Sequence, residues 1–390
     1  MRDAFCACAQ RALSGLFGLT LVFIASLGTA PQTTAAVLRV NLNATNQPID
    51  GSTWTNAFRT LTNALSAASA GDEIWVAAGT YNGGILMKSG VALYGGFAAT
   101  ESERSARNPE RNETFIDGRG TVGGFFFTNT AQNDTRVDGF TFRNCVGAQG
   151  GAIRSQIGSP TIANNRFVNN LVTQFGGAIY LESSSAVVTN NYFAYNGSDL
   201  LLAGGALFAS NSTPRIENNT FSANRARDGG ALVFLQSSGF VERNHFIANR
   251  AARDGGAVAY FNASPRTLYN RFSGNASGSR GGALAINGGG SSPTVFNNVL
   301  IRNQASTNPT GDPRGGGAVF IDTFSLPSFV NNTLVSNTAP VGGILCSNAA
   351  VTLANNLIAF GSSGIGGAAT LQLFNNNLFG NSGSNYVGLA

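Results

Sequence analysis

The sequence predicts an all-β fold: a single-stranded right-handed parallel β-helix, or solenoid, with a short N-terminal capping helix. Three observations predict this fold. A Gly-Gly-Ala-aliphatic tetrad recurs about every 26 residues, a box that reads roughly NNxFxxN recurs in phase with it, and a short apolar run lies between them. A fixed period of this length is typical of stacked repeats. Three short strand-like segments per repeat make one coil, and parallel crossovers are strongly biased to right-handedness.

The tetrad marks the beginning of each coil. Glycine allows a tight bend and a close backbone approach, because it tolerates positive φ. The small apolar residues that follow suit the interior of stacked parallel strands. The tetrads begin at Gly150, Gly176, Gly204, Gly229, Gly255, Gly281, Gly316 and Gly342, with a weaker copy at Gly366.

The box predicts two interior columns. Equivalent residues of successive coils should lie ~4.8 Å apart along the axis. The aromatic position should form an interior stack, and the last Asn should form an amide ladder at a bend. The stack would contain Phe167, Phe193, Phe221, Phe246 and Phe272, and the ladder Asn170, Asn196, Asn224, Asn249, Asn275 and Asn303.

The chain divides into three segments. Residues 1–36 are expected to be a signal peptide, because positive charge at Arg2 and Arg11 precedes an apolar run and a stretch of small residues. Residues 37–135 are expected to form the N-terminal cap and first coils, and residues 136–390 the repeat coils of the same β-helix. The expected location is secreted, extracellular or on the outer-membrane surface, with no transmembrane segment in the mature chain.

The capping helix is expected over Trp54–Ala70, where Phe58, Leu61 and Leu65 lie on one face. An uncapped stack would expose unpaired backbone groups and its apolar interior. The polar and charged residues 98–113 are interpreted as a surface loop inserted between early coils.

Two cysteines, Cys145 and Cys346, remain after the predicted signal. They lie about eight coils apart, on the order of 38 Å at the strand spacing. Because a disulfide needs Cα atoms within ~7 Å, we expect none between them.

The net charge is mildly basic, with a formal value of +5, and Lys88 is the only lysine. A basic balance suits an acidic polysaccharide or an anionic cell surface. Nucleic acid is not expected as a partner, because the charge is scattered and no recognised module is present. We expect a monomer or end-to-end association.

The paired GGA[ILV] and FxxN motifs, over residues 138 to 381, resemble the repeats of the polymorphic outer membrane protein family. The segments "GDEIWVAAGTY" and "VALYGGF" look like the entrance of pectin lyase-like β-helix proteins. The first resemblance implies a β-helical surface protein with adhesive activity, within the pectin lyase-like superfamily.

One candidate binding surface is the loop between the last Asn of each box and the next tetrad. This loop varies in length, and insertions gathered on one side of a solenoid often mark its binding side. Two interpretations stay open: a solvated turn with alternating charges, or a surface that binds a partner. Its candidate residues are Arg225, Arg227, Asp228, Arg250, Arg253, Asp254, Arg280, Asp312 and Arg314.

A second candidate is one outward strand face. Glu217 and Glu242 occupy the same phase in adjacent coils, so their carboxylates should lie about 5 Å apart. Arg243 and His245 lie close in sequence. Such a pair of glutamates can bind Ca²⁺, or can divide acid and base roles in glycoside cleavage. In the alternative interpretation, arginines neutralise the two glutamates on an exposed face.

These observations favour a secreted or cell-surface protein that is adhesive or binds polysaccharide. One alternative is a polysaccharide lyase or glycoside hydrolase that acts on an acidic polysaccharide, with Glu217, Glu242, Arg243 and His245 as its candidate catalytic residues. Another is a purely structural surface rod. No cofactor is expected, apart from Ca²⁺ held by the two glutamates in the lyase alternative. Fold alone does not license activity.

Overall fold

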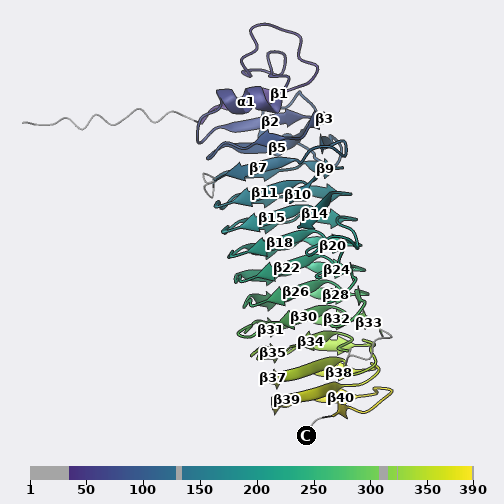
Figure 1. Cartoon of the computed structure of the whole chain (residues 1–390). Coiled ribbons are helices and arrows are strands. Elements are labelled where there is room, and N and C mark those ends of the chain that lie inside the picture. Colours follow the sequence, from purple (N-terminus) through teal and green to yellow (C-terminus); the bar gives the residue numbers. More distant parts are fainter. Residues whose placement is uncertain (1–34, 129–133, 307–314, 323, 389–390) are drawn as a thin grey trace, which may run out of the picture. The chain divides into compact units, whose positions relative to one another are not determined.

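The computed structural model describes residues 35–128, 134–306, 315–322 and 324–388. Ala35–Ala390 forms one compact unit of stacked coils that follow one another in sequence order (Figure 1). The fold is a right-handed parallel β-helix, as predicted. The predicted signal peptide, apart from its last two residues, lies outside the described residues. In the part that is described, no helix has the length and apolar character needed to cross a membrane.

The strands form four parallel sheets, called here sheets A to D. Sheet A takes two strands from most coils, which form two columns along the stack; β1 (Val37–Val40) and β2 (Glu73–Ala77) belong to the second column alone. The first of each pair is β4 (Ile85–Leu86), β7 (Phe125–Thr128), β11 (Ile153–Gln156), β15 (Ile179–Glu182), β18 (Leu207–Ser210), β22 (Leu232–Leu235), β26 (Val258–Phe261), β30 (Leu284–Asn287) or β34 (Val319–Ile321). The second is β1 (Val37–Val40), β2 (Glu73–Ala77), β5 (Ala92–Phe97), β8 (Arg136–Asp138), β12 (Thr161–Ala163), β16 (Val187–Thr189), β19 (Arg215–Glu217), β23 (Phe240–Glu242), β27 (Arg266–Leu268), β31 (Thr294–Phe296) or β35 (Ser328–Val330). The sheet is completed by β37 (Ile344–Ala354), β39 (Ile365–Phe374) and β41 (Tyr386–Val387).

Sheets B, C and D take the remaining strands. Sheet B contains β3 (Gly79–Asn82), β6 (Thr114–Asp117), β9 (Thr141–Arg143), β13 (Arg166–Val168), β17 (Tyr192–Ala194), β20 (Thr220–Ser222), β24 (His245–Ile247), β28 (Arg271–Ser273), β32 (Val299–Ile301), β36 (Thr333–Val335), β38 (Leu357–Ala359) and β40 (Asn377–Phe379). Sheet C contains β10 (Val146–Gln149) and β14 (Leu171–Phe175). Sheet D contains β21 (Arg225–Ala226), β25 (Arg250–Ala251), β29 (Ala276–Ser277) and β33 (Gln304–Ala305).

The predicted aromatic stack is confirmed. Centroids of successive rings lie 4.7 to 4.9 Å apart from Phe167 to Phe272, with interplanar angles of 6 to 9°. Phe142 extends the stack by one ring at 5.1 Å. Leu300 and Leu334 continue the same column in later coils. The column fills the core beneath sheet B, and its ring spacing matches the spacing of hydrogen-bonded parallel strands.

The predicted amide ladder is also confirmed. The Asn196 side-chain oxygen accepts the Asn170 backbone N–H at 3.1 Å and the Asn170 amide at 2.9 Å. The same pattern repeats from coil to coil and ends at Asn337. Each rung therefore satisfies buried backbone groups at a bend.

A second, parallel amide ladder was not predicted. It uses the second Asn of the box and lies at the bend between sheets A and B. Its members are Asn165, Asn191, Asn219, Asn244, Asn270, Asn298, Asn332, Asn356 and Asn376. The two ladders together explain the asparagine-rich box.

The tetrad glycines have separate roles. Gly204 adopts φ +70°, in the left-handed region that favours glycine. Gly205 lies so close to the next coil that an added Cβ would stand 2.0 Å from the Gly230 carbonyl oxygen. The tetrad is thus a requirement of coil stacking.

The capping helix is shorter than predicted. Helix α1 spans Leu61–Ala67, and the Thr60 side chain caps it by accepting the Asn63 N–H at 3.2 Å. The residues before it are not helical, because Phe58 pairs with Val40 in an isolated parallel bridge. Phe58, Leu61 and Leu65 are buried, as the predicted helix face required.

The two cysteines of the coils are free, as predicted, and the structure shows that both are buried. Burial raises the pKa of the Cys145 and Cys346 thiols to about 12. Because thiolate is the reactive form, both thiols should be inert at pH 8. In a chain that begins at Val37, Ellman's reagent should label no thiol in the native protein and both in guanidinium chloride. Rapid native labelling would contradict this burial.

Candidate functional site

The paired glutamates of the sequence prediction are register neighbours on β19 and β23. Arg215 Nε donates to Glu217 at 2.5 Å, and Arg215 Nη2 lies 3.8 Å from Glu242. Arg243 forms a second ion pair with Glu242. Both carboxylates are therefore neutralised, which favours the interpretation of a charge-balanced face. His245 lies past the bend on β24 of sheet B, where it neighbours Thr220 and Arg271 instead.

Among the described residues, no third His, Cys, Asp or Glu side chain joins Glu217 and Glu242 in a group that could hold a metal ion. Within the described ranges, no group of three or more His, Cys, Asp or Glu side chains is arranged to hold a metal ion. Calcium usually takes six or more oxygen ligands. The Ca²⁺ hypothesis thus stays a prediction from sequence register.

The loop between the last Asn of each box and the next tetrad forms ion pairs between successive coils. Arg253 donates to both Asp228 oxygens, at 2.7 and 2.6 Å, and Arg280 donates to both Asp254 oxygens, at 3.1 and 2.6 Å. Both aspartates are buried. Burial raises the pKa of the Asp228 carboxyl, while the hydrogen bonds from Arg253 oppose that shift. Asp228 and Asp254 are thus each paired with the arginine one coil later, and these two carboxylates are not solvated.

The other arginines of this loop face remain exposed. Arg225 and Arg250 are register neighbours in sheet D, and Arg227 follows in the first of these loops. Asp312 and Arg314, the last two candidates of the predicted surface, lie outside the described residues.

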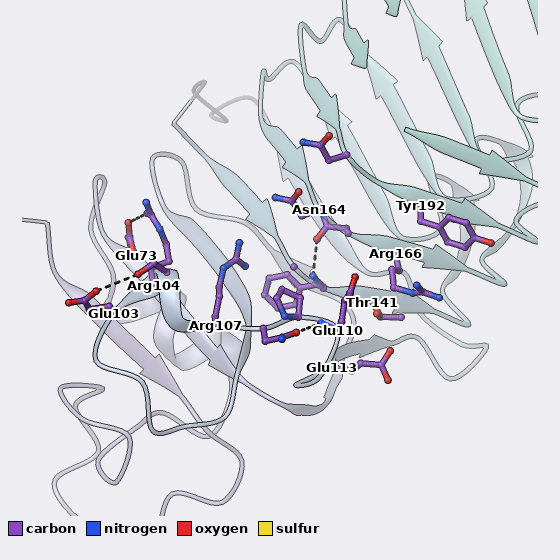
Figure 2. A pocket seen from close by; sticks show the side chains of 17 residues that line it. Glu73, Glu103, Arg104, Arg107, Glu110, Glu113, Thr141, Asn164, Arg166 and Tyr192 are labelled. Atoms are coloured by element: carbon purple, nitrogen blue, oxygen red, sulfur yellow. Dashed lines mark hydrogen bonds and ion pairs between the residues drawn. The ribbon is translucent and has the colours of Figure 1, made fainter. Parts of the chain in front are cut away.

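The structure contains a groove that the sequence analysis did not predict. Its volume is about 1420 Å³, and it lies between residues 98–113 and the stacked coils (Figure 2). Side chains from sheet B and from the bend between sheets A and B line its other side. They include Thr141, Asn164, Asn190, Arg166 and Tyr192.

A buried carboxylate fixes one wall of the groove. Asp138, on β8, is 1% exposed. It accepts hydrogen bonds from Arg107 at 2.5 Å, from Arg136 at 2.6 Å and from Asn164 at 2.9 Å. Arg107 also donates to the Gly95 carbonyl at 2.9 Å. Charge-assisted bonds of this kind are short and strong, so residues 98–113 are held against the coils.

The remaining charges in the groove divide into paired and unpaired groups. Arg104 forms an ion pair with Glu73 and donates to the Tyr94 hydroxyl at 3.1 Å. The Arg166 guanidinium lies 5.1 Å from the centre of the Tyr192 ring, a cation–π distance. Arg166 and the glutamates at positions 110 and 113 have no ion pair within the described parts of the chain.

The groove had a partial signal in the sequence. Arg166 and Tyr192 occupy the same position of the box in successive coils, and both side chains face outward from sheet B. Residues 98–113 were correctly interpreted as an inserted surface loop. The sequence did not indicate which residue holds this loop in place. Nothing in the sequence around Asp138 predicts that its side chain is buried and binds Arg107.

Comparison with solved structures finds only distant likeness. A bacteriophage HK620 tailspike protein of E. coli, in complex with a hexasaccharide, is 14% identical, with a TM-score of 0.33, over 90% of this chain and 78% of that one. Pectate lyase Pel9A is 13% identical, with a TM-score of 0.33, over 90% and 78%. The A-module of Azotobacter vinelandii mannuronan C-5 epimerase AlgE4 is 13% identical, with a TM-score of 0.32, over 84% and 91%. Such likeness assigns no ligand to this chain.

Comparison with curated proteins finds no match. A protein-family model gives the remaining comparison, and it agrees with the stacked coils described above. Residues 123–300 match the family model described as "Right handed beta helix region".

Proposed function

We propose that this chain is a secreted or cell-surface protein that binds a neutral or amino-bearing polysaccharide in the groove beside residues 98–113. One observation carries the proposal. The groove presents unpaired polar side chains next to a flat surface made by Arg166 over Tyr192. Its wall is fixed by the Asp138 network, so little ordering would be needed on binding.

The shape of the groove suits an elongated ligand. Thr141, Arg166 and Tyr192 are register neighbours on β9, β13 and β17, so they follow one another up the stack at ~4.8 Å per coil. A sugar ring has an apolar face of C–H groups and an edge of hydroxyls. An aromatic ring can cover the face, while amide and carboxylate groups can bind the hydroxyls. Asn190, two residues before Tyr192, supplies an amide near the ring, and Glu113 supplies a carboxylate elsewhere in the same groove.

The charges favour a ligand that is neutral or carries amino groups. Arg104 and Arg107 are committed to Glu73 and Asp138, so they add little free positive charge. Among the described residues that line the groove, the charged groups without an ion pair are the Arg166 guanidinium and the carboxylates of Glu103, Glu110 and Glu113. A uronate polymer would meet like charge there, whereas an ammonium group would meet carboxylates. This preference differs from the acidic ligand that the net charge of the whole chain suggested.

Support for a surface location comes from the N-terminal signal-like segment. Support for adhesion comes from the resemblance to the polymorphic outer membrane protein repeats, which stays a prediction. The lyase or hydrolase alternative loses support at its predicted centre, because Glu217 and Glu242 are both held in ion pairs with arginine.

The proposal predicts a specific loss of binding on changing Tyr192. Replacing Tyr192 with alanine should weaken glycan binding by about tenfold or more, because it removes the flat surface and its hydroxyl. The matched control is Tyr195→Ala. Tyr195 is 62% exposed and lies outside the groove, and Ala223 occupies the same bend position one coil later.

The measurement is isothermal titration with a panel of defined oligosaccharides: neutral β-linked glucans and xylans, chitosan oligomers and oligogalacturonates. The proposal requires binding by a neutral or amino-bearing member, reduced by Tyr192→Ala and unchanged by Tyr195→Ala. Equal binding by both variants would refute the assignment of the groove. Binding by oligogalacturonate alone, weakened by Tyr192→Ala and therefore located in the groove, would refute the proposed charge preference.

A further inference from the structure

Three arginines form an exposed cluster on the loop face, called here the arginine row. Arg225 and Arg250 are directly opposite one another on the parallel strands β21 and β25 of sheet D. Their backbones are therefore ~4.8 Å apart along the axis. Arg227 lies two residues after Arg225, on the same outward side, because Ala226 between them points into the protein and is fully buried.

Within the described residues, no carboxylate forms an ion pair with any arginine of the row. Asp228 and Asp254, the acidic residues of the same loops, are bound by Arg253 and Arg280. Asp199, in the loop of the preceding coil, forms no ion pair with the row within the described ranges. Like charges directly opposite one another in a sheet are destabilising. An anion between the two guanidinium groups would relieve that repulsion.

We propose that the arginine row binds the sulfate or carboxylate groups of an anionic polysaccharide, at a second site that shares no residue with the groove. Guanidinium groups bind such oxyanions through paired N–H donors. Arg225 and Arg250 follow one another along the coil axis, so two consecutive charged groups of one linear polymer can each meet an arginine, while Arg227 lies beside Arg225 in the same coil. The site is bounded, because the register neighbours before and after the row are Gly197 and Ala276.

The neighbours of the row favour a polysaccharide over a single-stranded nucleic acid. Binding of single strands relies on aromatic side chains on which the bases stack. The register neighbours of Arg225 and Arg250 in sheet D, Gly197 and Ala276, offer no ring. Phe175, Phe208 and Phe261 line a small pocket with Arg227, but Phe208 is 3% exposed and the other two are only partly exposed, so they offer little open ring surface for stacking. A polysaccharide needs only the regularly spaced cations and the hydrogen-bond donors that the arginines supply.

The test measures binding of immobilised dextran sulfate by surface plasmon resonance, at ~50 mM and ~300 mM NaCl, with uncharged dextran as the blank. The variant Arg225→Gln/Arg250→Gln is compared with Arg271→Gln/Arg302→Gln. The control removes the same charge from two exposed arginines elsewhere that have no ion pair within the described residues. Polygalacturonate and a single-stranded oligonucleotide serve as further probes.

The row variant should bind dextran sulfate or polygalacturonate about tenfold more weakly than the wild type, with a shallower salt dependence, while the control changes little. It should fold at least as stably, because repulsion is removed. An equal loss in both variants would overturn the proposal, since binding would then follow net charge alone. Tighter binding of the oligonucleotide, with the same arginine dependence, would also overturn it. Tyr192→Ala should leave this binding unchanged, which separates this site from the groove.

Discussion

Replacing Phe221 with alanine is expected to lower the free energy of unfolding by about 4 kcal/mol, because a fully buried ring is lost and a cavity remains. The Phe221 ring is stacked between Phe193 at 4.7 Å and Phe246 at 4.9 Å, so two aromatic contacts are lost as well. Urea unfolding followed by circular dichroism measures the effect.

Phe221→Leu is the matched control. Leu300 and Leu334 occupy the same column three and four coils later, so the core accepts this shape. We expect a cost of less than about 1.5 kcal/mol for this variant. A loss of similar size in both variants would contradict the proposed contribution of buried volume.

Asn224→Ala is expected to cost on the order of 4 kcal/mol, although it removes no apolar surface. The Asn224 side chain accepts two hydrogen bonds from Asn196 and donates to the Phe193 carbonyl and to Asn249. Its loss leaves several buried polar groups without partners, and each costs about 1–3 kcal/mol. The same urea experiment measures it.

The control for the ladder is Asn218→Ala, in the same box. Asn218 is exposed and adopts φ 56°, so only its preference for the left-handed region is lost. We expect a cost of about 1 kcal/mol. If the two alanine variants are equally stable, the ladder does not contribute to stability as described.

The architecture could be predicted from the sequence because residues one repeat apart become neighbours in successive coils. The phase of Phe167 and Asn170 within the box placed both columns correctly, since equivalent residues of a parallel stack must be neighbours. The same logic would have found the second ladder at Asn165, because that Asn recurs with the same period. The prediction covered only the last Asn of the box.

The candidate sites were predictable only in part. Sequence register correctly paired Glu217 with Glu242, but side-chain geometry decided that Arg215 and Arg243 neutralise them. The groove could not be predicted, because residues 98–113 lie outside the repeat. Their docking depends on Asp138, whose burial follows from contacts distant in sequence.

We propose that different residues stabilise the coils and recognise ligands. The tetrads and the two ladders hold the coils, and the residues that depart from the repeat form the groove and the arginine row. The two surfaces differ in charge, so they should take different ligands and should not compete. Dextran sulfate should bind equally well when the groove is saturated with a neutral or amino-bearing glycan.

Hydrogen–deuterium exchange with a bound glycan tests the central claim, that the groove is the binding site, most directly. The ligand is the best neutral or amino-bearing oligosaccharide from the titration panel, at saturation, on the chain that begins at Val37. We predict slower exchange at the amides of residues 103–113, with no change at residues 225–228. Slower exchange at residues 225–228, with none at residues 103–113, would contradict the claim.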